Sequence, residues 1–277
     1  MGLNALTVDL EEWFHICGGG EQVAPANWPR LPSRVVPNTE RLLDLFDRRQ
    51  VRATFFVLGY VAECHPDLVR RIAGAGHEIG SHGSRHDRAY DLGPDAFAKD
   101  LDASVEAIRV CGVDAVSIYR APEWSINDRS LWALDVLAAR GFRVDSSMAP
   151  MRRVGSPEYA REVHTRHTAS GPIIECPPAV VRRFGQHIPF GGGWGLRMSR
   201  PAQVTRAVEA RNRRGQSTVF WVHPWEVDDD PPRVRLSWPL WMAHYFCLTG
   251  FGGRLAEILA DTMVGPLGEL DRVSAPE

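Results

Sequence analysis

The sequence has no long apolar run, no clustered cysteines and almost no net charge. No stretch of about 18 apolar residues occurs, so no membrane span is expected. The five cysteines are widely spaced and include no CxxC pair, which argues against a disulfide framework and against a thiolate zinc site. A net charge of −2 gives no reason to expect nucleic acid or an anionic membrane as a partner.

The N-terminal segment MGLNALTVDLEEWFH also lacks the basic region and long apolar core of a secretory signal, so we expect a cytoplasmic protein. The 277 residues are 44% hydrophobic and 24% charged, as in ordinary globular proteins. An α/β barrel of this length commonly forms one undivided domain.

Short apolar strands alternate with amphipathic helices along the chain. Such alternation predicts parallel strands joined by right-handed crossovers, and therefore a barrel-like α/β domain with its function at the carboxyl ends of the strands. The helix at 39–49 is expected to begin with Asn38 as its cap. The expected strands are 3–10, 52–59, 77–82, 115–122, 142–147, 172–178 and 217–226, and the expected helices are 39–49, 67–75, 97–111, 128–140 and 199–215.

Charged or titratable side chains stand at or just past the carboxyl ends of five of these strands. Because the carboxyl ends of parallel strands meet at one face of a barrel, these side chains are expected to converge. They are Asp9, Glu11 and Glu12; His82 and His86; Arg120; Asp145; and His223.

The two histidines stand four residues apart in the stretch EIGSHGSRHD. If the intervening chain forms one turn, both imidazoles project to the same side. Two neutral imidazoles and a carboxylate suit a divalent transition metal such as Zn²⁺. Asp9 and Glu11 share one strand face, so they suit a metal ligand and a base that deprotonates water. The alternative is that the two histidines only form hydrogen bonds within a turn and that the acidic segment is a loop or a helix N-cap.

The remaining strand-end residues suit supporting roles. Arg120 could hold a catalytic carboxylate in its ionised form through a bidentate pair, or could serve as a structural ion-pair arginine. His223 ends an apolar strand and, beside a metal site, becomes a possible general acid for a leaving amine. Asp145 is a plausible partner that would fix the tautomer of His223 and raise its basicity.

Several aromatic residues neighbour these positions and could line a sugar site, although tryptophan is equally common in cores. The Gly-rich stretch FGGGWG (190–195) lacks the Lys-Ser/Thr of a phosphate-binding loop, so we assign it to a substrate groove or tight turn. The predicted substrate-binding residues are Trp13, Pro122, Trp124, Trp194 and Trp225.

In this order, the segments TVDLEE, HGSRH, RAP, VDSS and WVHP resemble the five motifs of the polysaccharide deacetylase family of metal-dependent carbohydrate esterases. Together they cover most of residues 4 to 226. The remainder resembles a subgroup found beside exopolysaccharide and exosortase loci, which has a C-terminal extension. The resemblance implies a distorted (β/α) barrel with fewer than eight complete units over residues 1–226, and a helical extension over 227–277 packed on the same domain.

The resemblance also implies roles for individual residues. Asp9 would be the catalytic base, held by Arg120, and His223 would be the general acid, supported by Asp145. His82 and His86 would be metal ligands. Much of the family has two adjacent aspartates in the first motif, whereas this chain reads Asp9-Leu10-Glu11-Glu12. A glutamate must then be the third ligand. Because side chains alternate along a strand, Glu11 shares a face with Asp9; this strand parity favours Glu11, with Glu12 as the second choice.

The activity implied is hydrolysis of the N-acetyl group of an amino sugar, either a small metabolite or a carrier-linked sugar. Water activated by a divalent metal would attack the amide; the expected metal is Zn²⁺, with Co²⁺, Ni²⁺, Mn²⁺ and Fe²⁺ as alternatives. The alternatives are another amide hydrolase on the same scaffold, such as an allantoinase-like enzyme or a deformylase, and a sugar-binding relative without turnover.

Overall fold

The computed structural model describes residues 4–183 and 185–270. The strands are β1 (Asn4–Leu10), β2 (Thr54–Val57), β3 (Glu78–Ser81), β4 (Ile118–Tyr119), β5 (Val144–Asp145), β6 (His164–Thr168), β7 (Gly171–Glu175), β8 (Val180–Arg183), β9 (Gln186–Pro189), β10 (Val219–Val222) and β11 (Val264–Gly265). Within these residues, nine strands form one sheet in the order β10-β1-β2-β3-β4-β5-β7-β6, with β11 beside β1, and β8 and β9 form a hairpin.

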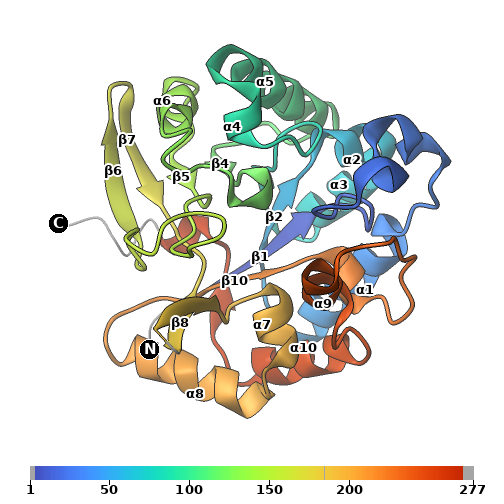
Figure 1. The fold of residues 1–277 in the computed structure, drawn as a ribbon, viewed down its shortest axis with the longest axis vertical. Helices are drawn as coiled ribbons and strands as arrows, with labels where there is room; N and C mark the ends of the chain where they lie inside the picture. The colour runs from blue at the N-terminus through green and yellow to red at the C-terminus, as the bar shows by residue number, and fades with distance from the viewer. Residues whose placement is uncertain (1–3, 184, 271–277) are drawn as a thin grey trace.

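Helices surround this sheet, as Figure 1 shows. They are α1 (Val35–Arg49), α2 (Gly59–Cys64), α3 (Pro66–Gly74), α4 (Ala89–Leu92), α5 (Pro94–Val110), α6 (Trp132–Ala139), α7 (Gly193–Met198), α8 (Pro201–Asn212), α9 (Trp238–Tyr245) and α10 (Phe251–Ala260). Short 3-10 helices are η1 (Gly20–Val23), η2 (Pro25–Arg30), η3 (Pro122–Trp124) and η4 (Pro224–Val227). None of the described helices has both the length and the apolar character that a membrane crossing needs.

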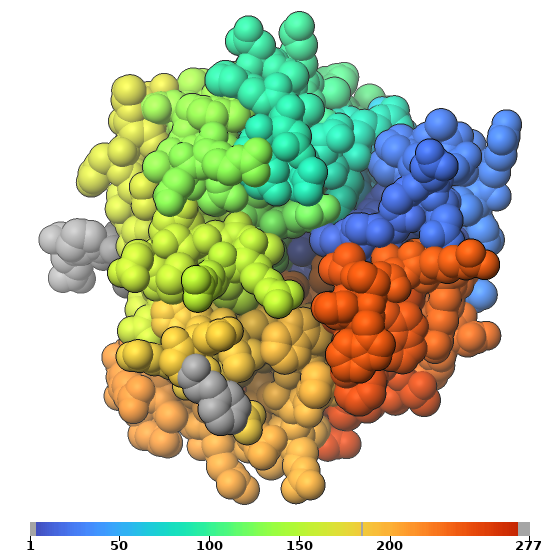
Figure 2. All heavy atoms as spheres, viewed as in Figure 1, coloured from blue at the N-terminus to red at the C-terminus, as the bar shows by residue number. Residues whose placement is uncertain are grey.

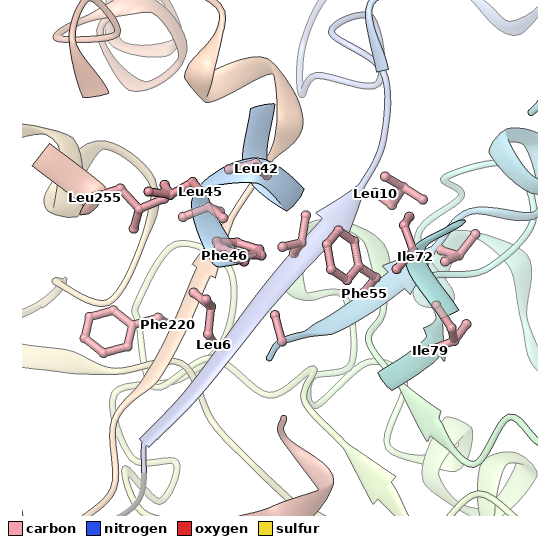
Figure 3. Packing of buried hydrophobic residues seen from close by; sticks show 14 of the residues in the cluster. Leu6, Leu10, Leu42, Leu45, Phe46, Phe55, Ile72, Ile79, Phe220 and Leu255 are labelled. Atoms are coloured by element: carbon pink, nitrogen blue, oxygen red, sulfur yellow. The ribbon is translucent and has the colours of Figure 1, made fainter. Parts of the chain in front are cut away.

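Side chains of β1 alternate between two environments, as a period of two requires. Leu6 and Leu10 lie in the main core cluster together with Leu42 and Phe46 of α1 and Phe220 of β10. Figure 3 shows this cluster between the strands and the helices. Burial of each such side chain is worth about 1.5–3 kcal/mol. The opposite face of β1 carries Thr7 and Asp9, which are also buried.

The sheet curves round on itself. A second cluster contains residues from strands far apart in the sheet order, including Ala5, Ile118, Val144 and Val219. Beyond β7, the Ala179 carbonyl accepts the Phe190 N–H at 3.1 Å, and the Gly191 carbonyl accepts the N–H of Trp221 in β10 at 3.0 Å. These bonds link β7 to β10 outside the regular strands. The predicted α/β fold with a distorted barrel is confirmed, and the regular strands described do not close it.

Two expectations about elements were wrong. The expected strand 172–178 is present as β7, but it pairs antiparallel with β6, a partly buried strand that the sequence pattern did not indicate. Helix α1 begins at Val35 rather than after Asn38. The reason is that the Glu12 carboxylate accepts the N–H of Arg34 at 2.9 Å, which stabilises the helix start from a distant part of the chain.

Residues after 226 pack on the same core as the rest. Phe251 and Leu255 of α10 belong to the main cluster, and β11 pairs in parallel with β1 at Asn4 and Ala5. The division into 1–226 and 227–277 stays a prediction. Residues 1–3 and 271–277 lie outside the described residues, and the first of these segments includes Leu3 of the first expected strand.

Candidate metal centre and catalytic site

Three of the predicted residues form a group that could hold a metal ion. One ligand atom each from Glu11, His82 and His86 lies within 4.8 Å of the other two. Oε2 of Glu11 is buried and is 2.9 Å from Nε2 of His86, the distance of an ion pair when that ring is protonated. A buried carboxylate oxygen and a ring nitrogen that face each other across this distance could bind a metal ion in place of the proton. The donor set of one carboxylate and two imidazoles is one that Zn²⁺ accepts.

Neighbouring groups fix the orientation of these side chains. Nδ1–H of His82 donates to the carbonyl of Arg120 at 2.8 Å, which leaves its Nε2 as the free nitrogen. Nε1–H of Trp225 donates to Oε1 of Glu11 at 3.4 Å. His86 has a φ of 61°, a left-handed conformation that a non-glycine residue rarely adopts and that turns its ring toward Glu11.

The charges of this group are consistent with a cation site. Burial lowers the pKa of His82 to about 4, so its ring is neutral near pH 7. Burial alone would raise the pKa of Glu11, but the charge of His86 holds it well below its usual range. Burial alone would lower the pKa of His86, but the charge of Glu11 and its hydrogen bond favour the protonated ring, and the net effect is a raised pKa. The ionised carboxylate would stabilise a metal ion in the same way.

Glu12 faces away from this group. Its carboxylate accepts hydrogen bonds from the hydroxyl of Ser33 and from the backbone N–H of Arg34. These contacts occupy it at the start of α1. The placement therefore agrees with the preference for Glu11 over Glu12 that strand parity gave.

Asp9 and Arg120 form a buried ion pair beside the metal group. Nη1 of Arg120 donates to Oδ1 of Asp9 and to Oγ1 of Thr7, at 2.7 Å each. Nη2 and Nε of Arg120 donate to the hydroxyl and the carbonyl of Ser146. Because Oδ1 is engaged by the guanidinium, Oδ2 of Asp9 remains available as a proton acceptor.

His223 closes the other side of the site. Its Nε2 lies 3.4 Å from Oε1 of Glu11 and 3.8 Å from Oδ2 of Asp9. Its Nδ1–H donates to Oε2 of Glu226 at 3.0 Å. Burial alone would lower the pKa of His223, but the hydrogen bond and charge of Glu226, with the charge of Glu11, raise it to about 9.

The structure does not place Asp145 beside His223. Oδ1 of Asp145 accepts the hydroxyl of Ser147 at 2.5 Å, and its strand register sets it next to Glu175 of β7. Both carboxyls are completely buried. The expected pairing of Asp145 with His223 is therefore corrected to a pairing of Glu226 with His223. The physical reason is that Asp145 lies on a strand whose neighbour is β7, whereas Glu226 follows His223 by one tight turn.

The Asp145–Glu175 pair predicts a pH-dependent stability. Burial and the charge of Asp145 raise the pKa of Glu175 well above its usual value, so the folded protein holds a proton that the unfolded chain releases. The contribution of this pair to the free energy of unfolding should then fall as pH rises above about 4.5, by up to about 1.4 kcal/mol per pH unit until the folded-state pKa is reached. Glu175→Gln cannot titrate, so its thermal midpoint relative to wild type should rise between about pH 5 and pH 8.

Thermal melts of both proteins across that range test this expectation. The exposed Glu257→Gln change is the matched control and should show no pH-dependent difference. A constant offset between Glu175→Gln and wild type at all pH values would contradict the shared proton.

The tryptophans divide into buried and exposed groups. Trp13 donates its indole N–H to the carbonyl of Pro32, and both Trp13 and Trp225 are buried, as is Pro122. Among them, Trp225 stacks on the ring of His223, with 4.9 Å between ring centres. Trp194 is 37% exposed. Trp124 is half-buried, and the centre of its ring lies 4.8 Å from Cζ of the Arg120 guanidinium. The substrate-binding roles of all five residues stay predictions.

The face that carries the site is hollowed. Figure 2 shows a depression near the middle of this face, where segments coloured blue, green and orange-red meet. In the same view, the carboxyl end of β1 points toward that region (Figure 1). Segments far apart in the sequence therefore border one concave surface at the strand ends.

Sequence reasoning missed Glu226 and Arg197. Glu226 is fully buried, accepts the His223 backbone N–H at 2.9 Å and is paired with the Arg197 guanidinium. The sequence HPWE carried a signal for Glu226, because an acid three residues after a helix cap and a proline at the first helical position form a capping-box pattern. Nothing in the sequence around Arg197 indicated its partner.

Comparisons with known proteins agree with this geometry. A family model described as polysaccharide deacetylase matches residues 29–142, and one described as a domain of unknown function, DUF3473, matches residues 146–270. His82, His86 and Arg120 lie in the first match. His223 lies in the second.

Curated relatives match over part of their length. The chain is 28% identical over 120 residues to a peptidoglycan-N-acetylglucosamine deacetylase of Bacillus cereus, which is 39% of this chain and 44% of that protein. It is 34% identical over 100 residues to a chitooligosaccharide deacetylase of Rhizobium leguminosarum bv. trifolii, 36% of this chain and 44% of that protein. The matched stretch thus spans less than half of these relatives.

A solved structure shows the same fold. A protein of Mycobacterium smegmatis described as a polysaccharide deacetylase superimposes with a TM-score of 0.62 at 23% identity, over 100% of this chain and 94% of that one.

Proposed function

Because this chain belongs to the polysaccharide deacetylase family, with a DUF3473 region over its second half, we propose that it hydrolyses the N-acetyl group of an amino sugar. The observation that carries the proposal is the convergence at one point of Asp9, His223 and the trio of Glu11, His82 and His86. A base, an acid and a metal-ligand set are the parts that water attack on an amide requires.

Glu11, His82 and His86 would hold a divalent cation, for which we propose Zn²⁺. Such an ion supplies Lewis-acid polarisation of the acetamide carbonyl and makes water easier to deprotonate. The chain must therefore provide only the movement of protons and the orientation of the substrate.

Asp9 and His223 provide the two proton transfers. Oδ2 of Asp9 accepts a proton from the attacking water, while Arg120 holds the carboxylate in place through Oδ1. Nε2–H of His223 faces the same space and gives its proton to the leaving nitrogen as the carbon–nitrogen bond breaks. A positioned acid or base of this kind contributes roughly 10²–10⁴-fold to a rate.

Acetate release is the direct test. The purified chain should release acetate from oligomers of N-acetylglucosamine. Treatment with a chelator should lower the rate by on the order of a hundredfold or more, and added Zn²⁺ should restore it. Parallel assays with ureides and formamides separate other amide hydrolases from a deacetylase.

Two results would contradict the proposal. Turnover of a ureide or formamide with no acetate release would assign a different amide substrate to the same site. A metal-loaded protein that binds these oligosaccharides without turnover would be a binding relative.

A further inference from the structure

We propose that Glu226, held in place by Arg197, is the positioning residue for His223, so that the DUF3473 region supplies the complete proton-donating unit of the site. The inference rests on the proposed function, since it assigns a partner to the general acid of that reaction. It also gives a catalytic purpose to the Gly-rich segment and to part of the C-terminal region.

The contact between Glu226 and His223 is made twice. Oε2 of Glu226 accepts Nδ1–H of the ring at 3.0 Å and the backbone N–H of the same residue at 2.9 Å. The carboxylate of Glu226 therefore fixes the His223 ring relative to the His223 backbone. Nδ1 keeps its proton, which is hydrogen-bonded to Glu226. Nε2 is the nitrogen that faces Asp9 and Glu11. When the amide bond breaks, the Nε2 proton moves to the leaving nitrogen and Glu226 stays ionised.

Arg197 fixes the other oxygen of Glu226. Nη1 of Arg197 donates to Oε1 of Glu226, and the side chains of both residues have no exposed surface. The remaining donors of the guanidinium bind the carbonyls of Ala243 and Phe246 at the end of α9. A planar guanidinium held at three points is a rigid anchor for a carboxylate. The acid is thereby tied to the C-terminal region through α9.

Glycines in the stretch FGGGWG let Arg197 reach this place. A Cβ on Gly192 would lie 2.2 Å from the ring of Trp221 in β10. A Cβ on Gly195 would lie 1.8 Å from the carbonyl oxygen of Pro189. Only glycine allows the backbone this close approach, so α7 lies directly against β10 and β9, next to α9 (Figure 1). Arg197, in the last turn of α7, is then buried beside Glu226.

Amide and ester substrates separate a positioning role from a merely structural one. An amine leaving group needs a proton from His223, whereas the phenolate of para-nitrophenyl acetate leaves without one. Glu226→Gln should therefore lower kcat for the N-acetyl sugar by about 10–100-fold, with KM unchanged, and lower the ester rate by about threefold or less. Glu226→Asp, which keeps the charge but is one methylene shorter, should give an intermediate, amide-selective loss.

A double-variant comparison sharpens the test. Glu226→Gln made in a His223→Ala background should cause no further loss of amide turnover, because the residue that it positions is absent. Arg197→Lys should give a smaller amide-selective loss, and the exposed Glu257→Gln change serves as the matched control. Metal content and thermal midpoints are measured for every variant; if Glu226→Gln melts below the assay temperature, Glu226→Asp and Arg197→Lys supply the comparison.

Equal losses on amide and ester, or additive losses in the double variant, would overturn the proposal. An amide-selective loss in Asp145→Asn but not in Glu226→Gln would return the positioning role to Asp145. The outcome is separable from that of the proposed function. If no N-acetyl sugar were deacetylated, acetanilides would serve as the amide series, and Glu226 would still be tested.

Discussion

Replacing His82 with alanine is expected to remove both the bound metal and the amide hydrolysis, with a fall in kcat/KM on the order of a thousandfold. The proposed site has three protein ligands, and the variant would lose one of its two imidazoles. The ring of His82 is oriented by its hydrogen bond to the Arg120 carbonyl, so the substitution removes a nitrogen that is already directed into the site. Metal analysis after dialysis and acetate release from N-acetylglucosamine oligomers measure the two effects.

Two companion variants make this result specific. Asp9→Asn should keep the metal and lose roughly 10²–10⁴-fold in kcat, because only the base is changed. His167→Ala, an exposed histidine on β6, is the matched control and should keep both metal and activity. An unchanged metal content in His82→Ala would show that the ligand assignment is wrong.

Arg120→Leu is expected to cost about 3–5 kcal/mol of unfolding free energy. Arg120 is 1% exposed and donates hydrogen bonds to Asp9, Thr7 and Ser146, so leucine would leave a buried carboxylate without its counter-charge. At roughly 2–4 °C per kcal/mol for a chain of this size, the thermal midpoint should fall well outside experimental error. Urea and thermal unfolding give the two measurements.

A double-variant cycle identifies the cause of that loss. Asp9→Asn combined with Arg120→Leu should cost less than the sum of the single changes, by roughly 1 kcal/mol or more. Arg140→Leu removes a surface arginine from its pair with Asp102 and should cost at most about 1 kcal/mol. Strict additivity in the buried pair would mean that packing, not charge, makes Arg120 necessary.

The residues that converge at the site were predictable because one rule places them. Parallel strands bring their carboxyl ends to one face, and this rule selects Asp9, His82, Arg120 and His223 from the sequence alone. Strand parity further separated Glu11 from Glu12. These signals depend only on local pattern and strand direction, which the sequence carries.

The partner of His223 was not predictable in the same way. Asp145 also ends a strand, but its register beside Glu175 is a long-range property that no local pattern specifies. The early start of α1 has a similar origin, since the carboxylate of Glu12 reaches Arg34 across a long loop. Both errors concern hydrogen bonds between residues far apart in the sequence.

The pairing of β1 has a consequence for how the chain is made. This first strand is bordered by β10 and, at its amino end, by β11, which both lie in the last quarter of the sequence. A growing chain emerging from the ribosome must therefore carry an uncovered strand edge until nearly all of it has been synthesised, and such edges pair readily with other chains. We expect synthesis that stalls before Val219 to yield aggregates.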